Sequence, residues 1–153
     1  MKRTIAVASG MFVLAVGLYG QDIPEDRIPE SVLSTFRTTY GTISDVSWER
    51  EDDMFEAEFD LDGMEVSLLI TPDGTIVATE QELPLSEIPA SVRSAIQNLY
   101  PGASLEEGER ITTHEGMTYE VEIRSGGKEY ELQFDEEGNL IGKEEEGGTS
   151  DED

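Results

Sequence analysis

Carboxylates have the best-defined chemical spacing in this 153-residue sequence. They recur at every second position of two stretches, 55–76 (FEAEFDLDGMEVSLLITPDGTI) and 119–140 (YEVEIRSGGKEYELQFDEEGNL). That spacing puts side chains on one face of a β-strand. The predicted face consists of Glu56, Glu58, Asp60, Glu65, Glu120, Glu122, Arg124, Glu129 and Glu131. It could bind a partner that presents basic groups; the alternative is a solvated surface of an acidic protein.

Other side chains that commonly carry chemistry are scarce or isolated. The sequence has no cysteine and one histidine, His114, which lies beside a predicted turn. A zinc site or a nucleophilic triad needs several such side chains at suitable spacing. Residues 60–63 (DLDG) look like the start of an EF-hand loop, but Met64 and Thr71 stand where oxygen ligands would be required. We therefore expect no catalytic residue, no bound metal and no cofactor.

Tight glycine turns divide each stretch into the two strands of a hairpin. The turns are Asp62-Gly63 and Gly126-Gly127, and the second places Glu122 opposite Glu131. Residues opposite each other share a face, so the apolar side chains gather on one side and the carboxylates on the other. The like-charged pair costs stability. A slip of one residue would expose every apolar side chain, so the register is well specified.

The chain after residue 20 contains two copies of one unit. Ile28–Val32 (IPESV) recurs 60 residues later as Ile88–Val92 (IPASV), and the hairpins recur at a spacing of 64. In both copies the proline suits the first turn of a helix, and glycine follows the helix end. Helices of about eleven residues are too short to persist alone, so each must pack on a sheet.

We predict an α+β fold of two tandem αββββ repeats, with the helices on one face of an antiparallel meander. The sheet could be continuous across the repeats; the alternative is two independent domains joined by a hinge at 81–87. The predicted boundaries are 1–20 for a signal peptide, 21–82 for the first repeat, 83–146 for the second, and 147–153 for a disordered acidic tail.

The remaining strands are less well defined. In the first repeat, the alternation places Trp48 in the core. In the second repeat, a two-residue turn at 115–116 would point Ile111 outward and a three-residue turn would point it inward; we favour the second. The fourth strands should begin at Thr75 and Asn139. The charged run that follows Lys143 should be disordered.

The N-terminal segment and the charge suggest export. Residues 1–20 have a basic start, an apolar run and small residues before Gln21, as in a secretory signal; an uncleaved anchor is the alternative. Its removal changes the formal charge from −25 to −27, which repels nucleic acid and anionic membranes. Few lysines beside many acids also fit salt adaptation. We expect a periplasmic or secreted monomer that packing, rather than disulfides, stabilises.

The doubled order of IPxSV, a helix ending in Tyr-Gly or Tyr-Pro-Gly, and a meander with an acidic-Gly turn resembles the PepSY-like family of bacterial exported proteins. The likeness covers residues 23 to about 146, and that family is grouped with the β-lactamase inhibitory protein fold. It implies a periplasmic or surface location, tandem helix-plus-four-strand architecture, and binding or inhibition of a protein through the open sheet. The inhibitor's disulfides have no counterpart here, and no inhibitory contact matches residue by residue, so inhibition of a β-lactamase is not carried over.

We therefore expect an exported, non-catalytic module that binds or inhibits a protein or peptide with basic groups. One alternative is a passive cation-binding or envelope protein without a specific partner. Another is a carboxylate-based hydrolase. We disfavour the hydrolase because a flat sheet should neither exclude water nor shift carboxylate pKa values.

Overall fold

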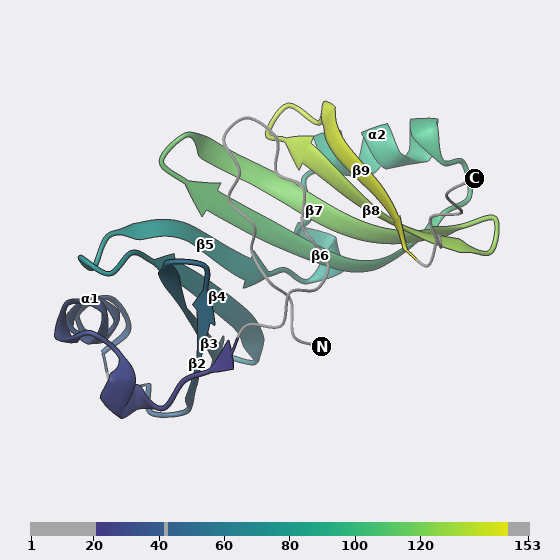
Figure 1. Ribbon diagram of the computed structural model, residues 1–153. Helices are drawn as coiled ribbons and strands as arrows, with labels where there is room; N and C mark the ends of the chain where they lie inside the picture. Colours follow the sequence, from purple (N-terminus) through teal and green to yellow (C-terminus); the bar gives the residue numbers. More distant parts are fainter. Residues whose placement is uncertain (1–20, 42, 147–153) are drawn as a thin grey trace, which may run out of the picture. The chain divides into compact units, whose positions relative to one another are not determined.

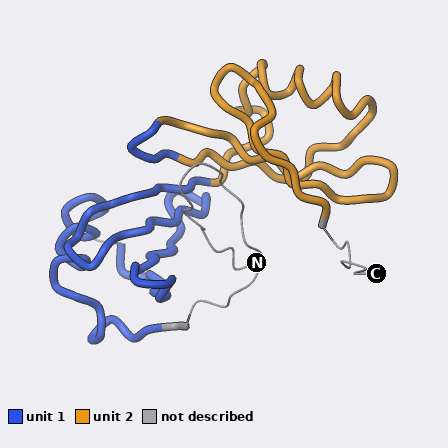
Figure 2. The backbone as a smooth tube through the Cα atoms, turned by 45° about the horizontal axis from the view of Figure 1, so that its top comes forward, with its two compact units in different colours: residues 1–81, 112–115 blue, residues 82–111, 116–153 orange. Residues whose placement is uncertain are grey.

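The structure is a computed structural model that describes residues 21–41 and 43–146 (Figure 1). Among these residues, 21–81 with 112–115 form one compact unit, and 82–111 with 116–146 form the other (Figure 2). The predicted signal peptide and the predicted tail at 147–153 lie outside the described residues. No helix within the described ranges is long and apolar enough to cross a membrane.

In the first unit, a helix precedes four antiparallel strands, and a two-residue strand comes before the helix. The elements are β1 (Gln21–Asp22), α1 (Glu30–Tyr40), β2 (Val46–Glu51), β3 (Met54–Leu61), β4 (Met64–Ile70) and β5 (Ile76–Glu82). Each strand pairs with the next in chain order.

The second unit again has a helix followed by four strands. The elements are α2 (Ala90–Leu99), β6 (Ser104–Thr113), β7 (Gly116–Ser125), β8 (Lys128–Asp135) and β9 (Leu140–Glu146). The strands follow the order β6-β7-β8-β9, and β8 pairs antiparallel with both β7 and β9. Short 3-10 turns at Glu25–Arg27 and Leu85–Glu87 precede α1 and α2. The predicted α+β class with antiparallel strands is confirmed.

The hairpin registers are those that the sequence predicts. Glu122 lies opposite Glu131, and Trp48 lies opposite Ala57. Asp62 and Gly63 have φ angles of 57° and 85°, which are typical of a type I′ turn and match the twist of the flanking strands.

Each helix packs on one side of its own strands. In the first unit, Val32 and Phe36 of α1 share a core with Trp48, which is 5% exposed, so its predicted core position is confirmed. In the second unit, Val92 and Ile96 of α2 pack on the inward residues of β7 and β8. Burial of these stripes stabilises helices that would not persist alone.

The helices are also attached to the turn before the last strand of each unit. Ser31 Oγ donates to the carbonyl of Pro72 at 2.6 Å, and Ser91 Oγ donates to the carbonyl of Glu136 at 3.3 Å. Gly138 has a φ of 86°, and a Cβ there would lie 2.8 Å from the Ser91 carbonyl oxygen. The recurrence of IPxSV with a turn glycine thus reflects a close helix–turn contact.

Four predictions about strand ends and turns are wrong. Residues 144–146 belong to β9, because Glu145 pairs with Tyr130 of β8 and accepts a hydrogen bond from Lys128 Nζ at 2.6 Å. β5 and β9 each begin one residue later than predicted. The loop between β6 and β7 is His114–Glu115, which matches neither predicted turn, and Ile111 is buried.

Candidate functional site

The predicted binding residues of the first unit lie on the strand face opposite its helix. Helix α1 packs on the side that carries the apolar residues of the β3–β4 hairpin (Figure 1). Because successive side chains of a strand alternate between faces, Glu56, Glu58 and Asp60 of β3 lie on the other side with Glu65 of β4. The register places Asp60 directly opposite Glu65. The four predicted residues of this unit therefore share one face.

A shallow depression of about 290 Å³ lies on this face. Its walls come from β2, β3, β4 and the segment before β2, so strand pairing creates it. Its lining residues are Asp45, Ser47, Glu58, Phe59, Asp60 and Glu65. Four of these six residues carry carboxylates, so the depression suits a cationic group.

Glu56 occupies the middle of the same face and is 3% exposed. Ser67 Oγ donates a hydrogen bond to Glu56 Oε1 at 2.6 Å. Burial raises the pKa of Glu56 to about 7; the Ser67 bond opposes the rise, and the carboxylates of Glu58, Glu49 and Glu65 add to it. Glu49 lies directly opposite Glu56 on β2. Glu56 can therefore gain and lose a proton near neutral pH.

Glu51, at the end of β2, shows the same behaviour. Burial raises its pKa to about 7, and the nearby carboxylates of Glu56, Asp52 and Glu49 add to the rise. The expectation that a flat sheet would leave carboxylate pKa values unshifted is wrong. Neighbouring strands shield the centre of the face from water, and like charges are concentrated there.

In the second unit, the predicted residues again occupy neighbouring positions on paired strands. Arg124 lies opposite Glu129 and forms an ion pair with it, and Arg124 Nε lies 3.9 Å from a Glu106 oxygen. Glu122 and Glu131, on the next row, are partly exposed. This face therefore combines carboxylates with one arginine, as predicted from the alternation.

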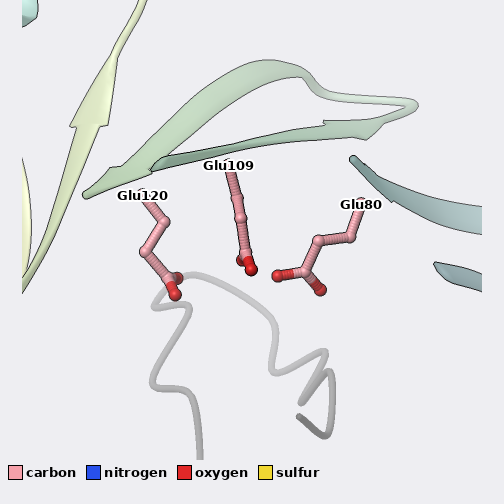
Figure 3. Close-up of side chains that lie close together, drawn as sticks. All are labelled: Glu80, Glu109 and Glu120. Atoms are coloured by element: carbon pink, nitrogen blue, oxygen red, sulfur yellow. The ribbon is translucent and has the colours of Figure 1, made fainter. Parts of the chain in front are cut away.

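Two further carboxylates of the second unit lie close together. Glu109 on β6 and Glu120 on β7 are both buried, with carboxylate oxygens within 4.8 Å of each other. Figure 3 shows the two side chains extending in the same direction from their strands. Oxygens of this kind can ligate a hard cation such as Ca²⁺, but two of them supply only part of its coordination sphere. By sequence spacing they correspond to Glu49 and Glu56 of the first unit.

The sequence predicts an open face, but the residues of this face differ widely in exposure. Glu56 and Glu120 are each 3% exposed, whereas Asp60, Glu65 and Arg124 are exposed. The exposed residues lie at or beside hairpin turns, and the buried ones lie mid-strand with a strand on either side. Position along the strand, which alternation ignores, decides exposure here.

Several residues of the face were missed. Ser47 and Glu49 alternate with Trp48, so the argument that placed Trp48 in the core could have found them. Glu109 was missed because the register of β6 was ambiguous. Glu80 of the first unit, also labelled in Figure 3, lies buried on β5 opposite Ser67. Glu80 was missed because the sequence predicts the strand that becomes β5 but does not fix its register.

Comparison with family models gives one match, and it occurs twice along the chain. A family described as "Putative beta-lactamase-inhibitor-like, PepSY-like" matches residues 16–78 and again 75–142. The chain belongs to the PepSY-like family. The predicted resemblance is therefore confirmed, and the family model's two matches each include one helix and its following strands. Comparison with curated proteins gives no match.

Several solved structures of similar fold come from Bacteroides species. A "putative periplasmic" protein of B. eggerthii has a TM-score of 0.71 at 19% identity, covering 76% of this PepSY-like chain and 88% of its own. A DUF2874 family protein of B. ovatus has a TM-score of 0.69 at 20% identity, covering 82% and 89%. A BLIP-like protein of B. fragilis has a TM-score of 0.67 at 19% identity, covering 86% and 93%. At these identities the likeness establishes the fold.

Proposed function

We propose that this PepSY-like protein is an exported, non-catalytic module that binds a protein or peptide partner through basic groups of that partner. The acidic depression of the first unit carries the proposal. Glu58, Asp60 and Glu65 lie on the face opposite α1, and Asp45, Asp60 and Glu65 are exposed. Such a surface attracts a lysine or arginine over a distance and loses affinity as salt rises.

Location and architecture complete the proposal. The signal-like residues 1–20 and the "putative periplasmic" relative support a periplasmic or secreted location. The two helix-plus-four-strand units support a tandem arrangement of αββββ repeats. A monomeric state is part of the proposal. The BLIP-like relative supports binding as the general mode of action, without indicating the partner.

The arrangement of the carboxylates disfavours the hydrolase alternative. Acid–base catalysis needs a titrating group within reach of a bound substrate. Glu51 and Glu56 have the raised pKa values, but neither lines the depression. These two carboxylates are therefore not available as acid–base groups within the depression.

The proposal can be tested by capture of partners from a native periplasmic extract at moderate and high salt. We compare the wild type with Asp60→Lys combined with Glu65→Lys, both exposed residues of the depression. The substitutions should lower partner recovery about tenfold or more, because they reverse the field at the site. A second variant, Glu122→Lys with Glu131→Lys, measures how much the second unit contributes to partner recovery.

The matched control is Glu136→Lys with Glu137→Lys, which makes the same charge change in the exposed β8–β9 turn. Equal losses in the control and in the Asp60 and Glu65 variant would mean that net charge alone governs binding. Recovery of no partner at either salt would favour the passive cation-binding alternative. Hydrolytic turnover that is lost on Glu56→Gln would favour the enzyme.

A further inference from the structure

β9 is the last strand in the sheet order, and no strand within residues 21–41 and 43–146 lies beyond it (Figure 1). Six of its seven residues pair with β8 on one side, and the register shifts at Ile141. In an antiparallel strand, successive backbone groups point alternately to either side, so half of the β9 groups point away from β8. Such a row of donors and acceptors is a template for another strand.

On the helix side of the strands, the charges of β9 are already engaged. Lys143 Nζ lies 4.6 Å from the centre of the Tyr130 ring and 5.3 Å from that of Tyr100. The Glu145 carboxylate accepts a hydrogen bond from Lys128. At the start of β9, where the register with β8 shifts, Leu140 lies opposite Phe134 of the core, and the adjacent Ile141 is 43% exposed. An added strand would therefore meet an apolar contact here rather than a charge.

The opposite side of β9 ends a row of carboxylates. Glu122 of β7 lies opposite Glu131 of β8, which lies opposite Glu144 of β9. A strand added beyond β9 would place one side chain directly beside Glu144. A basic side chain there would be attracted by the row, and an acidic one would be repelled.

These features select one kind of occupant. A second copy of this chain is disfavoured, because β9 carries three glutamates and one lysine and two such strands would repel each other. A basic, extended segment complements both the charge and the backbone groups that point away from β8. In antiparallel pairing, the residue opposite Glu144 precedes the residue opposite Ile141 by three positions. The fitting segment thus has a basic residue followed three positions later by an apolar one.

We infer that β9 is a docking edge that accepts an extended, basic segment of a partner protein as an added antiparallel strand. The edge lies on the second unit and the acidic depression on the first, so either can bind if the other does not. Main-chain hydrogen bonds would supply affinity, and the Glu144 and Ile141 positions would supply selectivity.

The test uses a fluorescein-labelled peptide of seven residues with the order Lys-Thr-Lys-Thr-Thr-Val-Thr and blocked ends. Binding to the full-length protein is measured by fluorescence anisotropy. Two N-methylated versions of the peptide carry the methyl groups on alternate residues of opposite parity. An added strand uses the N–H groups of one parity only, so one version should bind about tenfold or more weakly and the other almost unchanged.

Protein variants locate the peptide. Glu144→Lys should weaken binding about tenfold or more, whereas Glu137→Lys, which makes the same charge change in an exposed turn, should have a much smaller effect. Backbone amide NMR shifts should change along β9 on titration, and the spectra also report whether each variant is folded.

Several results would overturn the inference. One is absence of binding to the wild type. Another is equal affinity of the two N-methylated peptides, since a contact through charge alone does not distinguish backbone parity. Equal losses in Glu144→Lys and Glu137→Lys would exclude selectivity at β9. Loss on Asp60→Lys with Glu65→Lys, without shifts along β9, would instead place the peptide on the acidic depression.

Discussion

The two units use the same backbone plan but fill their cores differently at the start of the sheet. Ile23 N–H donates to the Trp48 carbonyl, and Leu83 N–H donates to the Gly108 carbonyl, both at 2.8 Å. Gly108 stands 60 residues after Trp48, so a glycine replaces the largest side chain of the first core. Ile88 occupies the freed space, because a Cβ on Gly108 would lie 2.7 Å from Ile88 Cδ1.

The aromatic residues show the same contrast. In the first unit, the Phe36 ring lies 5.5 Å from that of Trp48 and 5.2 Å from that of Phe59, deep in the core. In the second unit, isoleucines occupy the positions that correspond to Phe36 and Phe59. Its aromatic pair is Tyr100 and Tyr130, which are partly exposed and whose ring centres lie 5.3 Å apart. The two units thus keep the same backbone hydrogen bonds and fill their cores with different side chains. Cores tolerate such exchanges when the total volume is kept.

The largest effect is expected when Trp48, the residue that distinguishes the first core from the second, is replaced. Trp48→Ala should lower the free energy of unfolding by about 3–5 kcal/mol, because a large buried aromatic side chain is lost and a cavity is left. Gly108→Ala should cost about 1–2 kcal/mol, since the flexible end of Ile88 can shift. Urea unfolding followed by far-ultraviolet circular dichroism measures both. Equal costs would show that the two positions are filled to the same degree.

The hairpin registers were predictable because they rest on alternation and on turn residues that are local in sequence. Glu122 opposite Glu131 followed from Gly126-Gly127 alone. The β6 register was not predictable, because its turn at His114–Glu115 contains no glycine, unlike Asp62-Gly63 and Gly126-Gly127. Gly108 leaves space for Ile88 in the second core. The sequence does not reveal this role, since a glycine more often marks a turn.

The sequence predicts which residues share the acidic face. It does not predict how deeply each of them is buried. Alternation assigns Glu56 and Glu58 to one face correctly, but it cannot tell which of them the flanking strands bury. Residues 144–146 were predicted to be disordered from their charge, yet pairing with β8 orders them. Long-range pairing overrides composition at this edge.

The next expected effect concerns the pH dependence of the first unit. The pKa of Glu56 is about 7 in the folded chain and about 4.5 when unperturbed, so folding favours its protonated form. The resulting stability is present below pH 4.5 and is lost as the pH rises to about 7. Glu56→Gln should remove this loss and raise the free energy of unfolding at pH 8 by up to about 3 kcal/mol.

Urea unfolding at a series of pH values from 5 to 8 measures this effect. A residual slope should remain in Glu56→Gln, because the pKa of Glu51 is also raised, largely by burial. Glu137→Gln removes the same charge from an exposed turn and serves as the control. Parallel pH profiles for the wild type and Glu56→Gln would show that Glu56 is ionised throughout this range in the folded chain.

The smallest expected effect concerns the attachment of each helix to its turn. In the first unit, Ser31 bonds to the Pro72 carbonyl at 2.6 Å and Thr35 Oγ1 donates to the Gly74 carbonyl at 2.7 Å. In the second, Ser91 makes the longer bond of 3.3 Å, and Ala95 at the position of Thr35 has no hydroxyl. The first helix is therefore held more firmly to its turn.

Ser31→Ala with Thr35→Ala should lower the free energy of unfolding by about 1–2 kcal/mol, and Ser91→Ala by about 0.5 kcal/mol or less. Ala95→Thr sharpens the comparison, because it offers the second unit the bond that it lacks. A gain of about 0.5–1 kcal/mol is expected if the new hydroxyl reaches the Gly138 carbonyl. Amide hydrogen exchange in the two helices measures each change locally. If Ala95→Thr instead speeds exchange in α2, the helix lies too close to its turn for a hydroxyl, and packing rather than hydrogen bonding holds it there.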